Sequence, residues 1–164
     1  MSPIMDQNTL DFISHGAAQT RRLGMRLGRL FVGGEVVCLI GTLGTGKTCL
    51  AQGIGRGLGI HEMITSPTFT LINEYRARLV FYHIDLYRIV DVGDTLAFGL
   101  DEYLYGDGVC VIEWAERVEQ IWPQEYLQIH LRHTDETKRG LTFRGFGARY
   151  VDLLRTFRRE TFGI

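Results

Sequence analysis

The chain has 164 residues, of which 45% are hydrophobic, a length and composition typical of one globular domain. Its formal net charge is −1, which excludes a molecule that attracts nucleic acid or an anionic membrane over its whole surface. Because no apolar run approaches the roughly 20 residues that cross a bilayer and the N-terminus lacks a signal pattern, we expect a single cytoplasmic domain over residues 1–164 without membrane contact.

The first predicted elements alternate between strand and helix. Residues 9–14 form a short apolar run that predicts a strand. Ser14 is a candidate N-cap for a helix that runs to about residue 31, with leucines at helical spacing on one face. Residues 35–40, "EVVCLI", are apolar and β-branched, which predicts a buried strand.

Residues 41–48, "GTLGTGKT", match the phosphate-loop pattern G-x-x-x-x-G-K-[ST] in full. Such a match should arise by chance in roughly 0.3% of chains of this composition. Lys47 is one of only two lysines beside 16 arginines, and its compact ammonium fits beside β- and γ-phosphate oxygens. A helical pattern follows over residues 47–60, so the loop joins a strand to a helix, as phosphate binding requires.

This setting predicts how the loop binds phosphate. Its backbone N–H groups converge on the phosphates, and the helix N-terminus adds about half a positive charge toward them. The hydroxyl of Thr48 is a candidate Mg²⁺ ligand. The predicted nucleotide-binding residues are Thr42, Leu43, Gly44, Thr45, Gly46, Lys47 and Thr48.

The rest of the chain continues the alternation, with a predicted hairpin that turns near Arg76. The predicted elements are strands at residues 69–75, 77–85, 108–114, 126–131 and 141–146, and helices at 94–106, 115–122 and 150–160. We therefore expect an α/β fold, a P-loop NTPase-like three-layer domain with a mostly parallel central sheet and antiparallel edge strands.

Two acids follow apolar strands and are candidates for the chemistry of the site. Glu113 ends the run "VCVI", and Asp85 ends "VFYHI". Ligands of open α/β sheets bind beyond the carboxyl ends of the strands, so both acids are expected on the side of the phosphate loop. Spacing alone also allows each to be a solvent-exposed acid or a helix cap.

Other reactive side chains are expected to be structural. Cys38 and Cys110 lie in apolar strand-like runs, and together with Cys49 they show no metal-ligand spacing, so we expect reduced thiols. His83 is accompanied by neither a metal cluster nor a nucleophile and is expected to be an ordinary strand residue.

Five segments, "GTLGTGKT", "SPTFTLINEY", "YHIDLYR", "GLDEYL" and "VIEW", carry a resemblance to a known family. In this order and spacing, residues 14–131 resemble the TsaE (YjeE) family, small P-loop ATPases required for tRNA threonylcarbamoyladenosine synthesis in bacteria. "SPTF" with "H-x-D-L-Y-R" and "EW" is much more specific than the phosphate loop alone. The family usually has Ala at the position of Thr45 and often Asp at that of Thr42.

The resemblance implies roles for individual residues. Lys47 contacts the β- and γ-phosphates of ATP, and Thr48 and Glu113 hold Mg²⁺. Asp85 is needed for hydrolysis and orients water. Thr68 of "SPTF" lies in a switch-like loop that senses the γ-phosphate.

Trp114 is implied to lie beside the nucleotide, although spacing alone favours an ordinary core position for it. The resemblance also implies partners. A two-protein complex transfers the threonylcarbamoyl group to adenosine 37 of tRNAs that read codons starting with A. A TsaE-like protein binds that complex, and its ATP hydrolysis resets it between turnovers.

Two rival functions remain open from the residues. One is a small-molecule P-loop kinase, although no separate lid insertion is evident. The other is a nucleotide-gated adaptor that hardly hydrolyses ATP. Guanine specificity is disfavoured because no N-K-x-D or T-K-x-D segment exists.

The C-terminal segment is strongly basic. Between Lys138 and Arg159 lie seven basic residues and one acid, Asp152. Arg155, Arg158 and Arg159 are predicted to share one face of the terminal helix. The alternatives are a solvated helix face and a surface that meets the tRNA backbone or an acidic patch of a partner.

Overall fold

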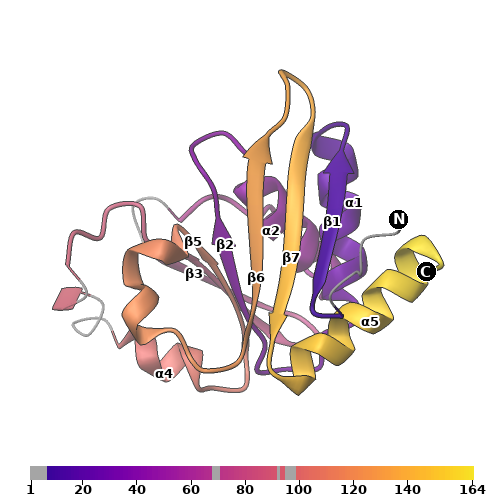
Figure 1. The fold of residues 1–164 in the computed structure, drawn as a ribbon. Helices are drawn as coiled ribbons and strands as arrows, with labels where there is room; N and C mark the ends of the chain where they lie inside the picture. Colours follow the sequence, from indigo (N-terminus) through magenta and orange to yellow (C-terminus); the bar gives the residue numbers. More distant parts are fainter. Residues whose placement is uncertain (1–6, 68–70, 92, 95–98) are drawn as a thin grey trace.

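A twisted sheet of seven strands organises the protein (Figure 1). The computed structural model describes residues 7–67, 71–91, 93–94 and 99–164, and the strand order across the sheet is β1-β7-β6-β2-β5-β4-β3. The elements are β1 Thr9–Ser14, α1 Ala17–Gly28, β2 Val36–Ile40, α2 Lys47–Gly57, β3 Ile72–Arg76, β4 Val80–Asp85, α4 Leu100–Leu104, β5 Val109–Glu113, the 3₁₀ helix η1 Ala115–Ile121, β6 Tyr126–His133, β7 Arg139–Phe146 and α5 Ala148–Phe162.

The centre of the sheet is parallel and its edges are antiparallel. Strand β2 pairs in parallel with β5 and β6, and β4 pairs in parallel with β5. The β1–β7, β6–β7 and β3–β4 pairs are antiparallel. All five residues of β5 are buried, as expected for a strand covered on both faces. The predicted sheet type is confirmed.

Helices cover both faces of this sheet and complete a three-layer arrangement. Buried side chains of α1, α2 and α5 pack with one face in a shared apolar cluster that includes Leu27, Ile54 and Phe157. A second cluster, with Leu100 from α4 and Val118 from η1, covers the other face. The predicted three-layer α/β fold is therefore confirmed.

The start of α1 differs from the prediction. Gly16, not Ser14, is the N-cap, and it makes no side-chain capping bond. Ser14 is the last residue of β1, and its hydroxyl lies 2.7 Å from Oγ1 of Thr20. The serine therefore ties the strand to the first turn of the helix instead of capping it. The helix ends at Gly28, before the predicted residue 31.

The helix before β5 ends earlier than predicted, and the helix after β5 is wound more tightly. Of the helix predicted at 94–106, the structure shows α4 at Leu100–Leu104, and residues 95–98 lie outside the described part. The predicted 115–122 helix is a 3₁₀ helix with non-helical angles at Val118. Ala115 and Val118 are both buried, and residues three apart share a face in a 3₁₀ turn.

The late elements run longer than predicted. Strands β6 and β7 form an antiparallel pair, and β7 begins at Arg139. Helix α5 spans 15 residues and buries Tyr150, Leu154 and Phe157. Among the described residues, no helix combines the length and apolar character needed to cross a membrane.

The cysteines are free thiols, as predicted. Cys38 and Cys110 are buried in β2 and β5, and Cys49 is half-buried at the start of α2. Burial raises the pKa of Cys110 to about 12, so its thiol stays protonated near neutral pH. These thiols act as small apolar side chains.

Candidate nucleotide-binding site

The phosphate-loop pattern forms a tight turn between β2 and α2. Gly46, the N-cap of α2, has a φ of 103°, a conformation that residues with a β-carbon rarely adopt. At Gly41 a β-carbon would lie 2.4 Å from the carbonyl oxygen of Leu131 on β6. A side chain at either glycine of the pattern would therefore be sterically unfavourable. The first N–H groups of α2 lie beside the loop, where an anion can bind.

The ammonium of Lys47 folds back onto this loop. Its Nζ donates hydrogen bonds to the carbonyl oxygens of Gly41 (2.5 Å) and Thr42 (3.0 Å), and it lies 4.0 Å from the centre of the Trp114 ring. Burial lowers the pKa of Lys47, and the negative charge of Glu113 acts in the opposite direction. No carboxylate in the described part of the chain forms an ion pair with this ammonium. Its charge is therefore available to an anionic ligand.

Hydrogen bonds link α2 to β5 and β4 beside the loop. The Thr48 hydroxyl donates to the Glu113 carboxylate, at 3.0 Å from Oε1 and 3.1 Å from Oε2. Nε2 of His83 lies 2.5 Å from Oε2 of the same carboxylate. Because an ionised carboxylate only accepts hydrogen bonds, His83 is the donor. His83 is fully buried and Glu113 is 3% exposed, so these bonds hold the carboxylate in one orientation.

Asp85 lies next to Glu113, since the two are register partners at the ends of β4 and β5. Its Oδ1 accepts the backbone N–H of Tyr87 at 2.9 Å, and Oγ of Ser66 lies 3.4 Å from Oδ2. Burial raises the pKa of Asp85, the Tyr87 N–H lowers it, and the charge of Glu113 raises it further. The two acids stand side by side at the loop's end of the sheet.

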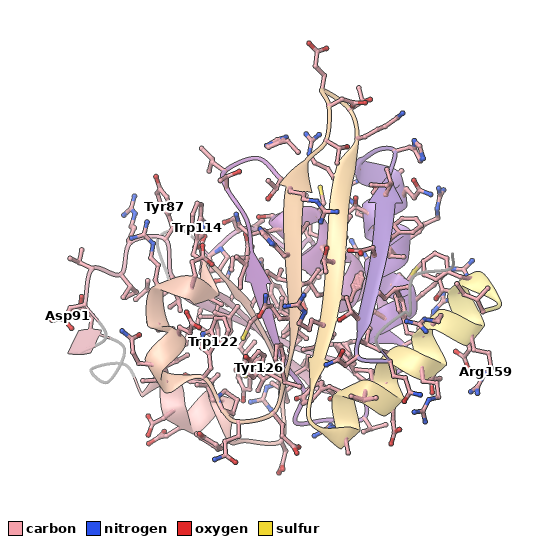
Figure 2. The ribbon with its side chains drawn as sticks, in the orientation of Figure 1. Tyr87, Asp91, Trp114, Trp122, Tyr126 and Arg159 are labelled. Carbon is pink, nitrogen blue, oxygen red and sulfur yellow. The ribbon has the colours of Figure 1, made fainter. Side chains whose placement is uncertain are left out.

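Aromatic side chains form one wall of the site. The rings of Tyr87 and Trp114 have their centres 5.0 Å apart, and Figure 2 shows them together at one edge of the molecule. The guanidinium of Arg117 lies 5.5 Å from the centre of the Tyr87 ring and 5.6 Å from that of Trp114. Trp114 has a φ of 59°, and such left-handed backbone in a bulky residue is often found at functional sites.

These groups line a cavity of about 430 Å³. The lining residues are Leu43, Gly44, Thr45, Gly46, Lys47, Thr48, Cys49, Ser66, Asp85, Tyr87, Glu113 and Trp114. Of the residues predicted from the sequence, Thr42 is not among them. Its carbonyl oxygen instead accepts bonds from Lys47 and from the buried hydroxyl of Thr45, at 2.9 Å. Thr68 lies outside the described residues.

A larger cavity, of about 600 Å³, lies at the ends of the parallel strands that are opposite to the phosphate loop. Gly34, Asp107, Pro123 and Arg149 are among its lining residues. The Arg149 guanidinium is already paired with Glu35, at 3.0 Å. The larger cavity also has carboxylates and tyrosine hydroxyls in its lining, but it has no lysine and no residue of the phosphate loop, so the smaller cavity is the candidate nucleotide site.

The sequence analysis missed the contact between His83 and Glu113. Strand side chains alternate, so Phe81, His83 and Asp85 share the face that α2 covers. That alternation could have placed His83 next to the acids. The sequence does not show the parallel register of β4 and β5, which sets His83 diagonally across from Glu113. Ser66 and Tyr87 were also missed. The Tyr87 N–H bonds Asp85 from two residues away, whereas Ser66 is distant in sequence and reaches Asp85 only through the fold.

Comparison with known proteins shows the family of this chain. The family model described as Threonylcarbamoyl adenosine biosynthesis protein TsaE matches residues 14–141. The crystal structure of YdiB from Bacillus subtilis is similar with a TM-score of 0.80 and 36% sequence identity, covering 93% of this chain and 95% of that one.

Relatives named tRNA threonylcarbamoyladenosine biosynthesis protein TsaE match over most of their length. The protein from Treponema pallidum is 47% identical over 79% of this chain and 96% of its own length. The protein from Bacillus subtilis is 45% identical over 77% of this chain and 80% of its own length. The protein from Nostoc sp. is 41% identical over 93% of this chain and 95% of its own. The chain therefore belongs to the TsaE family of tRNA threonylcarbamoyladenosine biosynthesis proteins.

Proposed function

We propose that this protein is a Mg²⁺-dependent ATPase that serves the threonylcarbamoyl modification of adenosine 37 in tRNAs that read codons starting with A. The observation that carries the proposal is the bond between the Thr48 hydroxyl and the Glu113 carboxylate, next to a phosphate loop and its lysine. Such a hydroxyl and carboxylate, adjacent to a triphosphate, are the protein's share of a Mg²⁺–nucleotide site.

The donor set fits Mg²⁺ and ATP. Mg²⁺ keeps several waters and binds few protein ligands together with phosphate oxygens. Among the described residues, no group of three His, Cys, Asp or Glu side chains gathers as a metal cage, in keeping with a metal that arrives with its nucleotide. Thr48 and Glu113 would hold the ion, which neutralises developing charge on the phosphates when bound.

Other residues of the site would bind the phosphates and orient the attacking water. Lys47 would turn its ammonium from the loop carbonyls to the β- and γ-phosphates, since phosphate oxygens are the stronger acceptors. Asp85, oriented by the Tyr87 N–H, would accept a hydrogen bond from the attacking water. Thr68 keeps its proposed role as the residue that senses the γ-phosphate.

ATP turnover would act on partner proteins. We infer that the protein binds the two-protein threonylcarbamoyl-transferase complex and that hydrolysis resets that complex between turnovers, with tRNA as the final substrate. Under this proposal the protein works in the cytoplasm, where tRNA is modified.

The test is ADP release by the purified protein with Mg²⁺–ATP, measured alone and with the transferase pair and tRNA. We expect turnover that increases when the pair and tRNA are both present. A small-molecule kinase would instead consume ATP faster when offered a metabolite alone. A nucleotide-gated adaptor would bind the pair only in one nucleotide state and release little ADP in any mixture.

We predict that Trp114 reports nucleotide binding. Its ring lies 4.0 Å from the Lys47 ammonium, so Mg²⁺–ATP or ADP should change its fluorescence. The other tryptophan, Trp122, donates its indole N–H to the Ala115 carbonyl and packs on Tyr126 away from the cavity. The Trp122→Phe variant isolates the signal from Trp114. A flat spectrum of this variant at saturating nucleotide would show that Trp114 does not sense the ligand.

We also predict that His83 positions the carboxylate of Glu113. His83→Leu removes the imidazole donor and should raise the Mg²⁺ concentration needed for nucleotide binding by about 10- to 100-fold, as losses of such outer partners do. Binding of nucleotide without Mg²⁺ should not change. The measurement is the Trp114 fluorescence titration at several Mg²⁺ concentrations. His83→Gln keeps a donor and should recover part of the loss, and a wild-type Mg²⁺ requirement in His83→Leu would refute the role.

A further inference from the structure

Charge is divided unevenly between the two helical layers. Helices α1, α2 and α5 together carry eight arginines and two acids, Asp152 and Glu160. On the other face of the sheet, α4 and η1 carry four acids and one arginine. The chain as a whole has a net charge of −1, so the excess of arginines on α1, α2 and α5 is a local feature of one face of the sheet.

The arginines predicted to share a face of α5 are partly used inside the fold. Arg158 is half-buried and donates from Nη2 to the carbonyl oxygen of Thr9, at 2.9 Å. Arg155 is paired with Asp152 at 3.2 Å. Arg159 is exposed, and Figure 2 shows its side chain extending outward from α5. Of the three arginines predicted to share a face of α5, Arg159 is therefore the one left exposed without an ion pair in the described structure.

The stronger basic feature is α1, which the sequence analysis did not single out. Arg22, Arg26 and Arg29 follow one another at spacings of four and three residues, so they lie in a row on one side, and all three are exposed. Helix α1 contains no acid. Within the described structure, the side chains of Arg22 and Arg26 make no hydrogen bond or ion pair. Like charges four residues apart repel each other, so the row itself costs stability.

This row borders a hollow between α1 and the end of α5. The cavity measures about 310 Å³, and Gln19, Arg22, Arg26, Thr161 and Phe162 are among its lining residues. Two arginines and other polar side chains in the lining suit a phosphodiester better than a purely apolar ligand, because arginines bind phosphate oxygens.

Helix α1 is also held rigidly. Gly24 and Gly28 of α1 meet Gly53 and Gly57 of α2, and a β-carbon on any of them would lie 2.2 to 2.5 Å from a carbonyl oxygen of the other helix. The backbones therefore touch, and α1 is fixed against the helix that begins in the phosphate loop. A row of arginines on such a support needs little reorganisation to bind a partner.

We propose that the α1 row, Arg22, Arg26 and Arg29, binds the phosphate backbone of tRNA. The planar, weakly hydrated guanidinium suits phosphate oxygens. Although the net charge of the protein is −1, this row is locally positive and complements a polyanion. The contact reads no bases and would orient the tRNA against the protein. The identity of the RNA rests on the proposed function above.

The test is fluorescence anisotropy of labelled, unmodified tRNA with the full-length protein, over a salt titration. In Arg22→Gln/Arg26→Gln, two phosphate contacts are lost, so affinity near 0.15 M salt should fall on the order of tenfold and the salt slope should decrease by about 2. The matched control is Arg76→Gln/Arg144→Gln. Both of its arginines are exposed but lie on β3 and β7, outside the basic layer, and the control should bind as wild type.

Circular dichroism and ATP turnover of the same samples show whether each variant is folded and active. Normal turnover with weakened tRNA binding supports the inference. Equal affinities of the two double variants, or a wild-type protein that does not bind tRNA at low salt, would overturn it. Normal tRNA binding by Arg22→Gln/Arg26→Gln with lost assembly onto the transferase pair would also overturn it and assign the row to an acidic protein. An absence of ATP turnover in wild type would contradict the proposed function but not this inference.

Discussion

Lys47→Ala should abolish ATP hydrolysis in a protein that still folds. The ammonium is the cation that the phosphate loop presents, and removing a group that stabilises developing phosphate charge costs roughly 10²-fold or more in turnover. The fold should survive, because within the described structure the Lys47 ammonium bonds only to two carbonyls of its own loop and lies over the Trp114 ring. The measurements are phosphate release with Mg²⁺–ATP and the circular dichroism spectrum.

Lys47→Arg is the matched variant, and it should fail as well. The Nζ atom lies between two loop carbonyls and the face of Trp114, which is a slot for a point charge. A planar guanidinium is wider than an ammonium and does not match that slot, although it keeps the charge. Normal turnover in folded Lys47→Ala would refute the assignment of the phosphate loop, and normal turnover in Lys47→Arg would refute the geometric part of it.

Glu113→Gln and Asp85→Asn should produce two different defects. The Glu113 carboxylate is bonded to the Thr48 hydroxyl, so its loss should raise the Mg²⁺ requirement and weaken binding of Mg²⁺–nucleotide. Asp85 is held by the Tyr87 N–H and makes no bond to Thr48, so Asp85→Asn should leave binding intact and lower turnover alone. Binding isotherms at several Mg²⁺ concentrations, with turnover measured on the same samples, separate the two.

The geometry favours this division of roles, but the two acids are neighbours in the register of β4 and β5. A reversed result, in which Asp85→Asn raises the Mg²⁺ requirement, would exchange the roles. Identical profiles for the two variants would show that the acids work as one unit. Lys47→Ala gives the reference profile, in which turnover is lost while both carboxylates remain.

Local patterns in the sequence were sufficient for much of the fold and for the centre of the site. A complete phosphate-loop pattern after an apolar strand predicted the β2–α2 turn. Its two glycines are required locally, by the backbone angles of the turn and by close contact with the adjacent strand β6. Asp85 and Glu113 were placed correctly at the loop's end of the sheet, since the ends of parallel strands share one edge. The motifs that resemble TsaE also predicted the family, which the comparisons confirm.

Only the tertiary structure decided how distant side chains meet. Strand register brought His83 onto Glu113, and a sequence without pairing partners does not specify register. The arginines show the same limit. Arg155, Arg158 and Arg159 were predicted to share one face of the terminal helix, but Arg158 donates a hydrogen bond to the Thr9 carbonyl on β1. The exposed row of arginines lies on α1 instead. A residue's charge can be read from the chain alone, but whether that charge is neutralised or left exposed depends on which elements pack beside it.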